Sequence, residues 1–319
     1  MEQARAQRES AREIGPYRLI TRLDPPGSAA PCRRFVARGR DGRTVLLSVP
    51  LPGADPVRFA AEAEAGRHLA GPWIAPVTEV SAPFAGTFSG GEAFSGGGSP
   101  GAPNAPVRQA WYTTPYLPAL PLPVALTVHG GPLPEAVVRG LGGVLAETLA
   151  AVHAGGLAHA GVSPAAVLIA VGGPLLGCFG AVRAAGPDGE PRAGHPGIDP
   201  GALAPEQAAG GRPRPPGDVF ALGAVLAYAA TGHTVPERDE LPPGLRPLVS
   251  ACLARDPADR PAAAALAAAF APSVPGAPLL APGWLPGRVV AALARQSAEL
   301  LAAELPPLPE RAATGPVPG

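Results

Sequence analysis

Few residues in this chain could do chemistry, and His159 is the most suggestive of them. It lies near the start of LAHAGVSPAAVLI (157–169), where only small residues and one proline separate the imidazole from an apolar run. An imidazole can act as a general base, but a lone histidine is more often packed in a core. The segment therefore has the form of a catalytic loop that has lost its other polar side chains.

Cations and thiols restrict the chemistry further. The chain contains no lysine among its 25 Lys and Arg positions, which excludes every mechanism that needs an ammonium group. Cys32, Cys178 and Cys252 are far apart in the sequence and form no Cys-x-x-Cys pair, so neither a disulfide framework nor a zinc site is predicted. The formal net charge is zero, which predicts no nucleic-acid partner.

The elements that must position these residues change in type along the chain. Alternating and β-branched residues predict strands at 17–23, 33–38, 43–49 and 109–117. A turn is predicted at Asp41-Gly42, between the second and third of them. The arginines of 33–43 are expected on the solvated face of two strands, with binding of an acidic partner as the alternative. Apolar periodicity and caps predict helices at 55–71, 133–156, 217–232, 245–254, 260–271 and 287–305, the last of them amphipathic.

One uncharged run, at 161–182, is long enough to be tested as a membrane helix. Pro164, Pro174 and the pair Gly172-Gly173 would break such a helix, so a buried hairpin is predicted instead. The N-terminal segment MEQARAQRES is polar, so no secretory signal is predicted. We therefore expect a cytoplasmic protein without a membrane span.

Five strings, taken together, resemble parts of the bacterial eukaryotic-like Ser/Thr protein kinases of the actinobacterial type. The resemblance covers about 14–270. Its strings are IGPYRLI (14–20), GGLAHAGVSPAAVLI (155–169), ALAPEQAAG (202–210), DVFALGAVLAYAATG (218–232) and CLARDPADRP (252–261).

The resemblance implies an α+β, bilobal protein-kinase-like fold with a small β-rich N-lobe and a large α-helical C-lobe. On this basis the N-lobe is expected at 14–117, with a flexible insert at 85–106, and the C-lobe at 118–272. A disordered tail is expected at 1–13. A Pro-rich link, the amphipathic helix 287–305 and a disordered end are expected within 273–319.

The resemblance also shows which catalytic residues of the family are replaced. The positions of its strand lysine, catalytic base, loop lysine and two metal ligands hold Ser48, Gly161, Ser163, Ala166 and Cys178. The Gly-rich phosphate loop is reduced to DPPGSA (24–29). Nucleotide-binding candidates by the resemblance are therefore weak, and they are Gly27, Glu62, Tyr116 and Leu117.

The family's scaffold residues are retained, which the resemblance places at His159, Phe179, Glu206, Asp218 and Arg260. A pseudokinase is therefore predicted: a scaffold or regulatory module with an unidentified protein partner and no cofactor or metal. The alternative is an active, atypical Ser/Thr kinase that uses ATP and Mg²⁺, with Arg33 or Arg43 as the cation and Glu62 or Asp188 as metal ligands. A third possibility is a cleft between the lobes that holds an apolar ligand.

Overall fold

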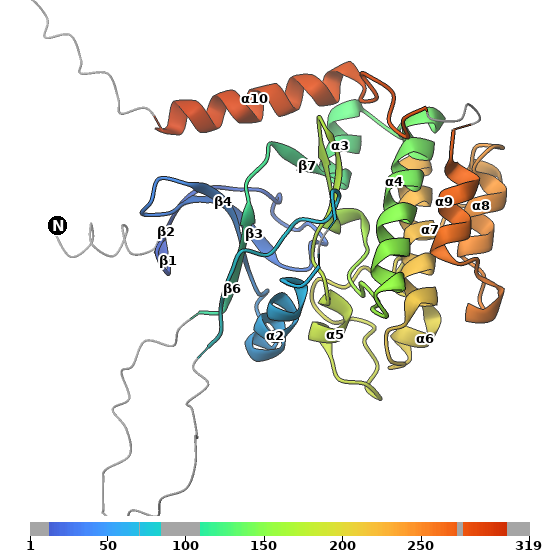
Figure 1. Ribbon diagram of the computed structural model, residues 1–319, viewed down its shortest axis with the longest axis horizontal. Helices are drawn as coiled ribbons and strands as arrows, with labels where there is room; N and C mark the ends of the chain where they lie inside the picture. Colours follow the sequence, from blue (N-terminus) through green and yellow to red (C-terminus); the bar gives the residue numbers. More distant parts are fainter. Residues whose placement is uncertain (1–12, 70, 84–108, 273–276, 305–319) are drawn as a thin grey trace, which may run out of the picture.

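The computed structural model describes residues 13–69, 71–83, 109–272 and 277–304. In Figure 1 a twisted sheet with one helix lies beside a larger, mainly helical part, as the bilobal α+β prediction requires. The sheet has the strand order β1-β2-β3-β4-β6-β5. Its strands are β1 (Glu13–Ile14), β2 (Tyr17–Arg22), β3 (Arg33–Arg38), β4 (Thr44–Val49), β5 (Glu79–Ser81) and β6 (Trp111–Pro115).

Local sequence explains the turn between β3 and β4 and the start of the helix beside the sheet, α2 (Pro56–Gly66). Gly42 adopts a positive φ of 80° in the turn between β3 and β4, as a tight turn requires. The Asp55 side chain caps α2 by accepting a hydrogen bond from the Val57 backbone N–H at 2.8 Å. The helix ends earlier than the predicted 71, because Leu69 turns inward and packs in a cluster with Ile74 and Val152.

The helical part also holds a small antiparallel sheet, and the predicted buried hairpin is confirmed in it. β8 (Val167–Ala170) pairs with β9 (Gly173–Leu176) and with β7 (Ala119–Pro121), a strand that sequence reasoning missed. The helices are α3 (Leu122–His129), α4 (Glu135–Ala154), α5 (Ala181–Ala185), α6 (Pro205–Ala208), α7 (Pro215–Thr231), α8 (Arg246–Cys252) and α9 (Ala263–Phe270). Three 3-10 turns complete this part: η1 (Pro164–Ala166), η2 (Arg238–Glu240) and η3 (Pro257–Asp259).

Helix α4 lies at the centre of the helical part and packs on α7 and α9. Gly142 and Gly143 permit this close approach, since a Cβ at Gly142 would lie 2.9 Å from the Phe270 ring. Within the described ranges, α4 is the one helix long and apolar enough to span a membrane by length and composition. Most of it is buried among other helices, which is the position of a core helix.

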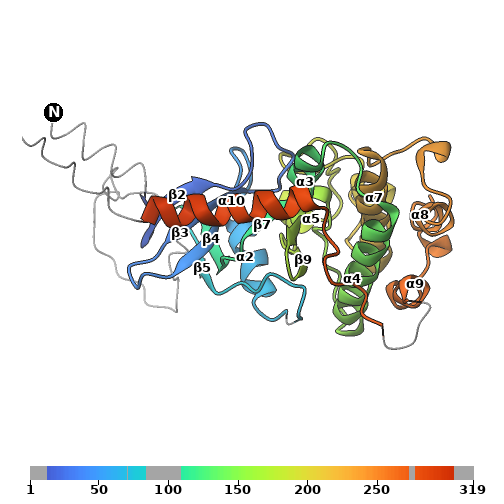
Figure 2. The same cartoon turned by 90° about the horizontal axis from the view of Figure 1, so that it is seen from above.

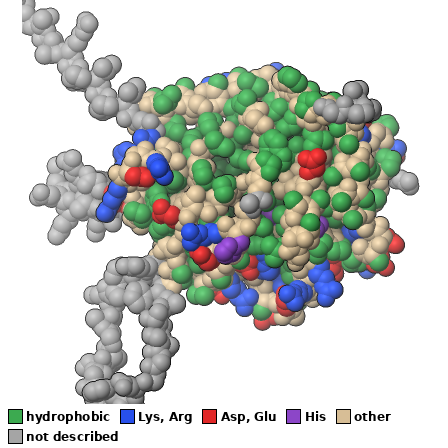
Figure 3. Space-filling view, viewed as in Figure 1, with side chains coloured by type: hydrophobic (Ala, Val, Ile, Leu, Met, Phe, Trp, Pro, Cys, Tyr) green, Lys and Arg blue, Asp and Glu red, His purple; other side chains and the backbone are tan. Residues whose placement is uncertain are grey.

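Helix α10 (Gly287–Glu304) packs on the domain rather than standing apart from it. Figure 2 shows it running over the sheet-bearing part and α3. Val289 and Leu293 are buried, and the Gln296 side chain donates to the Ala119 carbonyl at 3.2 Å. On the face in Figure 3, apolar side chains cover a wide area, and charged ones gather at its left and lower edges.

Three predicted segments fall largely outside the described ranges: the tail 1–13, the insert 85–106 and the end beyond α10. Glu13 is the exception in the first of them. It pairs with Arg18 between β1 and β2, so this one residue of the predicted tail belongs to the sheet.

Candidate functional site

The backbone of the catalytic-loop segment is held by Asp218, in the first turn of α7. Its carboxylate accepts hydrogen bonds from the N–H groups of His159 and Ala160, both at 2.7 Å. His153 Nε2 lies 3.0 Å from the same carboxylate. Asp218 is 1% exposed, so these bonds form away from water and fix the position of the loop.

His159 is completely buried and lies edge-on to Phe179, with ring centroids 5.5 Å apart and planes at 86°. Among the described residues, neither of its ring nitrogens has a hydrogen-bond partner. Burial lowers the pKa of His159 to about 4, so the imidazole is neutral at physiological pH. Its surroundings are those of a packing residue.

Gly161, at the family's catalytic-base position, lies directly against the backbone of Cys178. A Cβ at position 161 would stand 1.9 Å from the Cys178 carbonyl oxygen. The two segments are also joined by hydrogen bonds from Gly180 N–H to the His159 carbonyl at 2.9 Å and from Val182 N–H to the Ala160 carbonyl at 2.7 Å. In this arrangement the backbone occupies the place of a catalytic carboxylate.

The two other replaced loop positions serve local structure. The Ser163 hydroxyl accepts a hydrogen bond from the Ala166 N–H at 3.3 Å and so caps the turn η1. Ala166 is fully buried. Ile198, from the segment before α6, packs in a cluster with Ala160, Val182 and Leu203 and so covers the neighbouring loop from outside.

Arg34 was expected on the solvated face of two strands, but it is buried. Its exposed fraction is 2%. Its Nε donates to Asp24 Oδ2 at 2.9 Å, and its Nη2 donates to the other oxygen of the same carboxylate. Nη2 also donates to the Ala165 carbonyl in the catalytic-loop segment at 2.8 Å. Arg34 therefore joins the N-lobe to the C-lobe inside the cleft.

The expectation of a solvated face is wrong for Arg34 because the strand alternates. Arg34 and Val36 are both buried and lie on the same face of β3, two residues apart. Arg34 pairs in register with Ser48 of β4, the position of the family's lysine. Burial alone would lower the pKa of Arg34, but the Asp24 carboxylate outweighs burial and raises it well above its usual value.

Apolar side chains close the cleft beside Arg34. Leu46 of β4 packs in one cluster with Leu168 of β8, and Leu23 lies against the same cluster. These residues come from both lobes, so N-lobe and C-lobe side chains meet directly.

Glu62 on α2, which has no lysine to pair with in this chain, pairs instead with Arg183 of α5. Arg183 Nε donates to Glu62 Oε2 at 2.8 Å, and its Nη1 donates to the Ala158 carbonyl at 3.0 Å. The guanidinium also lies over the Phe179 ring, 4.7 Å from its centroid. The sequence did not reveal this partner, because it lies 121 residues away.

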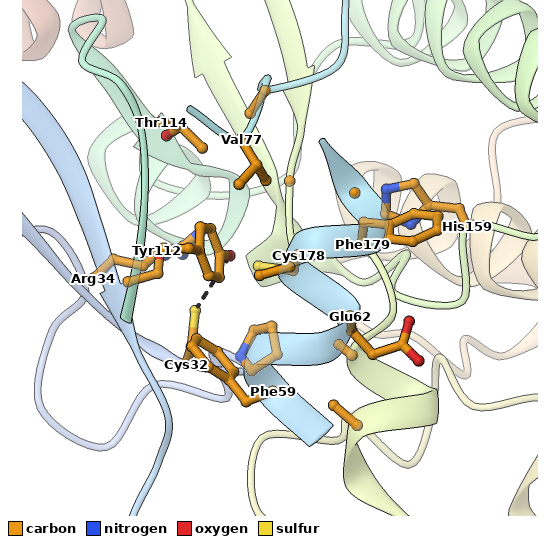
Figure 4. Close-up of a pocket in the computed structure, with 18 of the residues that line it drawn as sticks. Cys32, Arg34, Phe59, Glu62, Val77, Tyr112, Thr114, His159, Cys178 and Phe179 are labelled. Atoms are coloured by element: carbon orange, nitrogen blue, oxygen red, sulfur yellow. Dashed lines mark hydrogen bonds between the residues drawn. The ribbon is translucent and has the colours of Figure 1, made fainter. Parts of the chain in front are cut away.

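The interlobe pocket is the space between α2, β3, β4 and the segment before α5, and it includes Ser48, Glu62 and Cys178 in its lining (Figure 4). Its volume is about 60 Å³. Cys32 and Tyr112 also line it, with Cys32 Sγ 4.0 Å from the Tyr112 hydroxyl oxygen. The pocket is mostly apolar, and it brings together two cysteines that the sequence separates.

The retained pair Glu206 and Arg260 links α6 to the segment after η3. Arg260 Nη1 and Nη2 donate to the two Glu206 oxygens at 2.6 and 2.9 Å. The Arg260 side chain is 0% exposed, and its guanidinium lies 5.0 Å from the centroid of the Phe220 ring. Arg260 Nη1 also donates to the Pro216 carbonyl of α7 at 3.0 Å, so this partly buried, bidentate pair holds α6 beside the start of α7.

The four nucleotide-binding candidates do not meet at one place. Gly27 is exposed in the loop between β2 and β3, and Leu117 is 53% exposed in the connection between β6 and β7. The Tyr116 hydroxyl is buried with no hydrogen-bond partner in the described part of the chain, and burial raises its pKa. Of the four, Glu62 alone lines the interlobe pocket.

These residues do not fit ATP and Mg²⁺, the groups that the fold family implies. The Arg34 guanidinium is already bound to a buried carboxylate. Mg²⁺ prefers oxygen ligands, whereas the metal-ligand position holds the buried thiol of Cys178. The carboxylates proposed as substitutes, Glu62 and Asp188, bind Arg183 and Arg192 at separate places.

Solved structures with this arrangement of lobes are protein kinase domains. The kinase domain of PknI from Mycobacterium tuberculosis matches with a TM-score of 0.57 at 21% identity, over 81% of this chain and 96% of that domain. A mutant form of the same kinase domain matches with a TM-score of 0.58 at 22% identity, over 81% of this chain and 95% of that domain. The fold is therefore that of a protein kinase domain, and the fold class predicted from the sequence is confirmed.

Related sequences are bacterial Ser/Thr protein kinases. The chain is 33% identical to the probable serine/threonine-protein kinase PkwA of Thermomonospora curvata over 280 residues, which cover 80% of this chain and 34% of that protein. It is 30% identical to the serine/threonine-protein kinase AfsK of Streptomyces coelicolor, over 88% of this chain and 35% of AfsK. No protein-family model matches. The chain spans about a third of the length of these relatives, and it is a kinase-like domain whose homologues are actinobacterial Ser/Thr protein kinases.

Proposed function

We propose that this domain is a pseudokinase, which acts as a scaffold or regulatory binding module and does not transfer phosphate. The observation that carries the proposal is the contact between Gly161 and the Cys178 carbonyl oxygen, 1.9 Å from where a Cβ would stand. Backbone closes the position from which a base would act on a substrate hydroxyl. A protein partner and a cytoplasmic location stay predictions.

The charges in the cleft support the same proposal. Phosphoryl transfer depends almost entirely on positioning and on neutralising the charge of the phosphates. Here the buried cation, Arg34, is already neutralised by Asp24, and a phosphate would have to displace that carboxylate. Displacement would leave Asp24 as a buried, unpaired charge, which is strongly unfavourable.

The alternative function is an active, atypical, ATP-dependent Ser/Thr kinase. The names of the relatives favour it, because PkwA and AfsK are both described as Ser/Thr kinases. One feature of the site also favours it: Arg34 places a guanidinium opposite Ser48, and arginine is a competent phosphate ligand. This function requires Asp24 to leave Arg34 when nucleotide binds.

Nucleotide binding and phosphate transfer separate the two functions. The thermal unfolding midpoint of the purified chain is measured with and without Mg-ATP. In a separate assay, incorporation of radiolabelled phosphate is measured on the chain itself and on a general protein substrate. A ligand at 100 times its Kd stabilises a folded protein by about 2.7 kcal/mol, which is readily detected. We expect no stabilisation and no incorporation above that of a heat-inactivated sample.

Two variants make the test specific. Gly161→Asp is expected to gain no transfer activity, because any Cβ there meets the Cys178 backbone. If the wild-type chain does transfer phosphate and Arg34→Met abolishes the transfer without unfolding the chain, the atypical kinase replaces our proposal. Circular dichroism of each variant checks that the fold is retained.

A further inference from the structure

Two buried thiols meet in the interlobe pocket, one from each lobe. Cys32 lies directly before β3 and Cys178 lies between β9 and α5, and both are free and at most 8% exposed. Cys32 Sγ lies 4.0 Å from the Tyr112 hydroxyl oxygen, and Cys178 lines the same pocket as both residues. Figure 4 shows both side chains directed into the same space beside Tyr112.

The two thiols are chemically unequal. The neighbouring Cys32 thiol and the positive charge of Arg34 lower the pKa of Cys178, although burial opposes them. The neighbouring Cys178 thiol, together with burial, raises the pKa of Cys32 well above its usual value. Since the thiolate is the reactive form, Cys178 is the nucleophile, and Cys32 keeps its proton as the resolving thiol.

The interlobe pocket gives a small oxidant access to both cysteines. Its space of about 60 Å³ exceeds the roughly 10–15 Å³ that one water molecule needs. Exposed residues, Asp55 and Pro196, also contribute to the lining, so the pocket reaches the surface. Hydrogen peroxide fits this space.

We propose that Cys32 and Cys178 form a peroxide-responsive thiol pair whose disulfide joins the two lobes. The Cys178 thiolate attacks one peroxide oxygen, the O–O bond breaks, and the departing hydroxide takes a proton to become water. The Cys32 sulfur then attacks the resulting sulfenic sulfur, the S–O bond breaks, and the Cys32 proton leaves in a second water. Two thiols are oxidised to one disulfide while one peroxide is reduced to two waters.

The disulfide would connect the same two parts of the molecule as the Arg34–Ala165 hydrogen bond. Oxidation therefore holds the cleft closed, and reduction leaves it closed by noncovalent contacts alone. Disulfides in reducing compartments are usually transient and regulatory, which agrees with a switch rather than a permanent crosslink. This inference stands whether or not the domain transfers phosphate.

Peptide mapping of the wild-type chain tests the proposal. The reduced, purified chain is treated with hydrogen peroxide, its remaining thiols are blocked with an alkylating agent, and it is digested with trypsin. Trypsin cleaves this chain only after arginine, because the chain contains no lysine. We expect peptide 23–33 linked to peptide 140–183, with the loss of two hydrogen atoms, and reversal by dithiothreitol. Cys252, where burial raises the pKa to about 12, is expected to stay alkylatable and to react at least about tenfold more slowly.

Two variants assign the roles within the pair. Cys252→Ser is the matched control and is expected to form the link as the wild type does. Cys32→Ser is expected to leave a sulfenic acid on Cys178, which a cyclic dione reagent traps. The proposal is overturned if peroxide produces no link, a link only between two chains, an untrapped Cys178 in Cys32→Ser, or oxidation of Cys252 as fast as that of Cys178.

Discussion

The buried ion pair between Arg34 and Asp24 gives the sharpest prediction for stability. Both side chains are at most 2% exposed, and three hydrogen bonds hold the guanidinium in the cleft. Arg34→Met leaves the Asp24 carboxylate buried without a partner, which costs about 3–5 kcal/mol. The double variant with Asp24→Leu removes both charges and is expected within about 2 kcal/mol of the wild type, since only the Ala165 carbonyl loses a partner.

Urea unfolding followed by circular dichroism measures these differences, and the two single variants with the double variant form a complete cycle. The matched control is Arg43→Met, since Arg43 and its partner Asp41 are both mostly exposed. We expect no measurable change there. If Arg34→Met costs less than about 1 kcal/mol, the value of a surface ion pair, then Arg34 is solvated and our description of the cleft is wrong.

Two further predictions concern pH and helix α10. His159 titrates near pH 4 when folded and near 6.5 when unfolded, so the unfolded state binds its proton first as the pH falls. Stability present above pH 6.5 is thus lost between pH 6.5 and 4, by about 3 kcal/mol. Urea unfolding at several pH values should show that His159→Leu loses less stability over this range than the wild type. An equal loss of stability would contradict the assignment of this pH dependence to His159. Leu293→Ala, at 1% exposure in α10, should cost about 2–4 kcal/mol, whereas Leu301→Ala, at 63% exposure, should leave the unfolding midpoint unchanged.

Local sequence signals found the elements of this fold better than their ends. β3 begins and ends as predicted at 33 and 38, because the turn glycine Gly42 and the alternating pattern both mark it. The strand β7 (Ala119–Pro121) was missed because Pro118 precedes it and Pro121 ends it, and proline disfavours a strand. It also pairs with a strand far along the chain. Its partner, β8, supplies the hydrogen bonds that make it a strand.

The replaced catalytic positions could be read from the sequence, since the identity of a residue decides whether it can be a base or a cation. The environment of each position could not be read from the sequence. That Gly161 lies against the Cys178 carbonyl depends on how two chain segments cross. The side chain of Arg34 was placed in solvent because charge suggested exposure, and its partner Asp24 became visible only in the fold.

Sequence alone determined which groups this protein lacks: it has no lysine, and glycine and cysteine stand where the kinase family has carboxylates. Only the tertiary structure decided which groups meet. Arg34 reaches Ala165 across 131 residues and Glu62 reaches Arg183 across 121. The reason is that composition and periodicity are local properties, whereas such a contact follows from the packing of many elements at once, and no short segment encodes it.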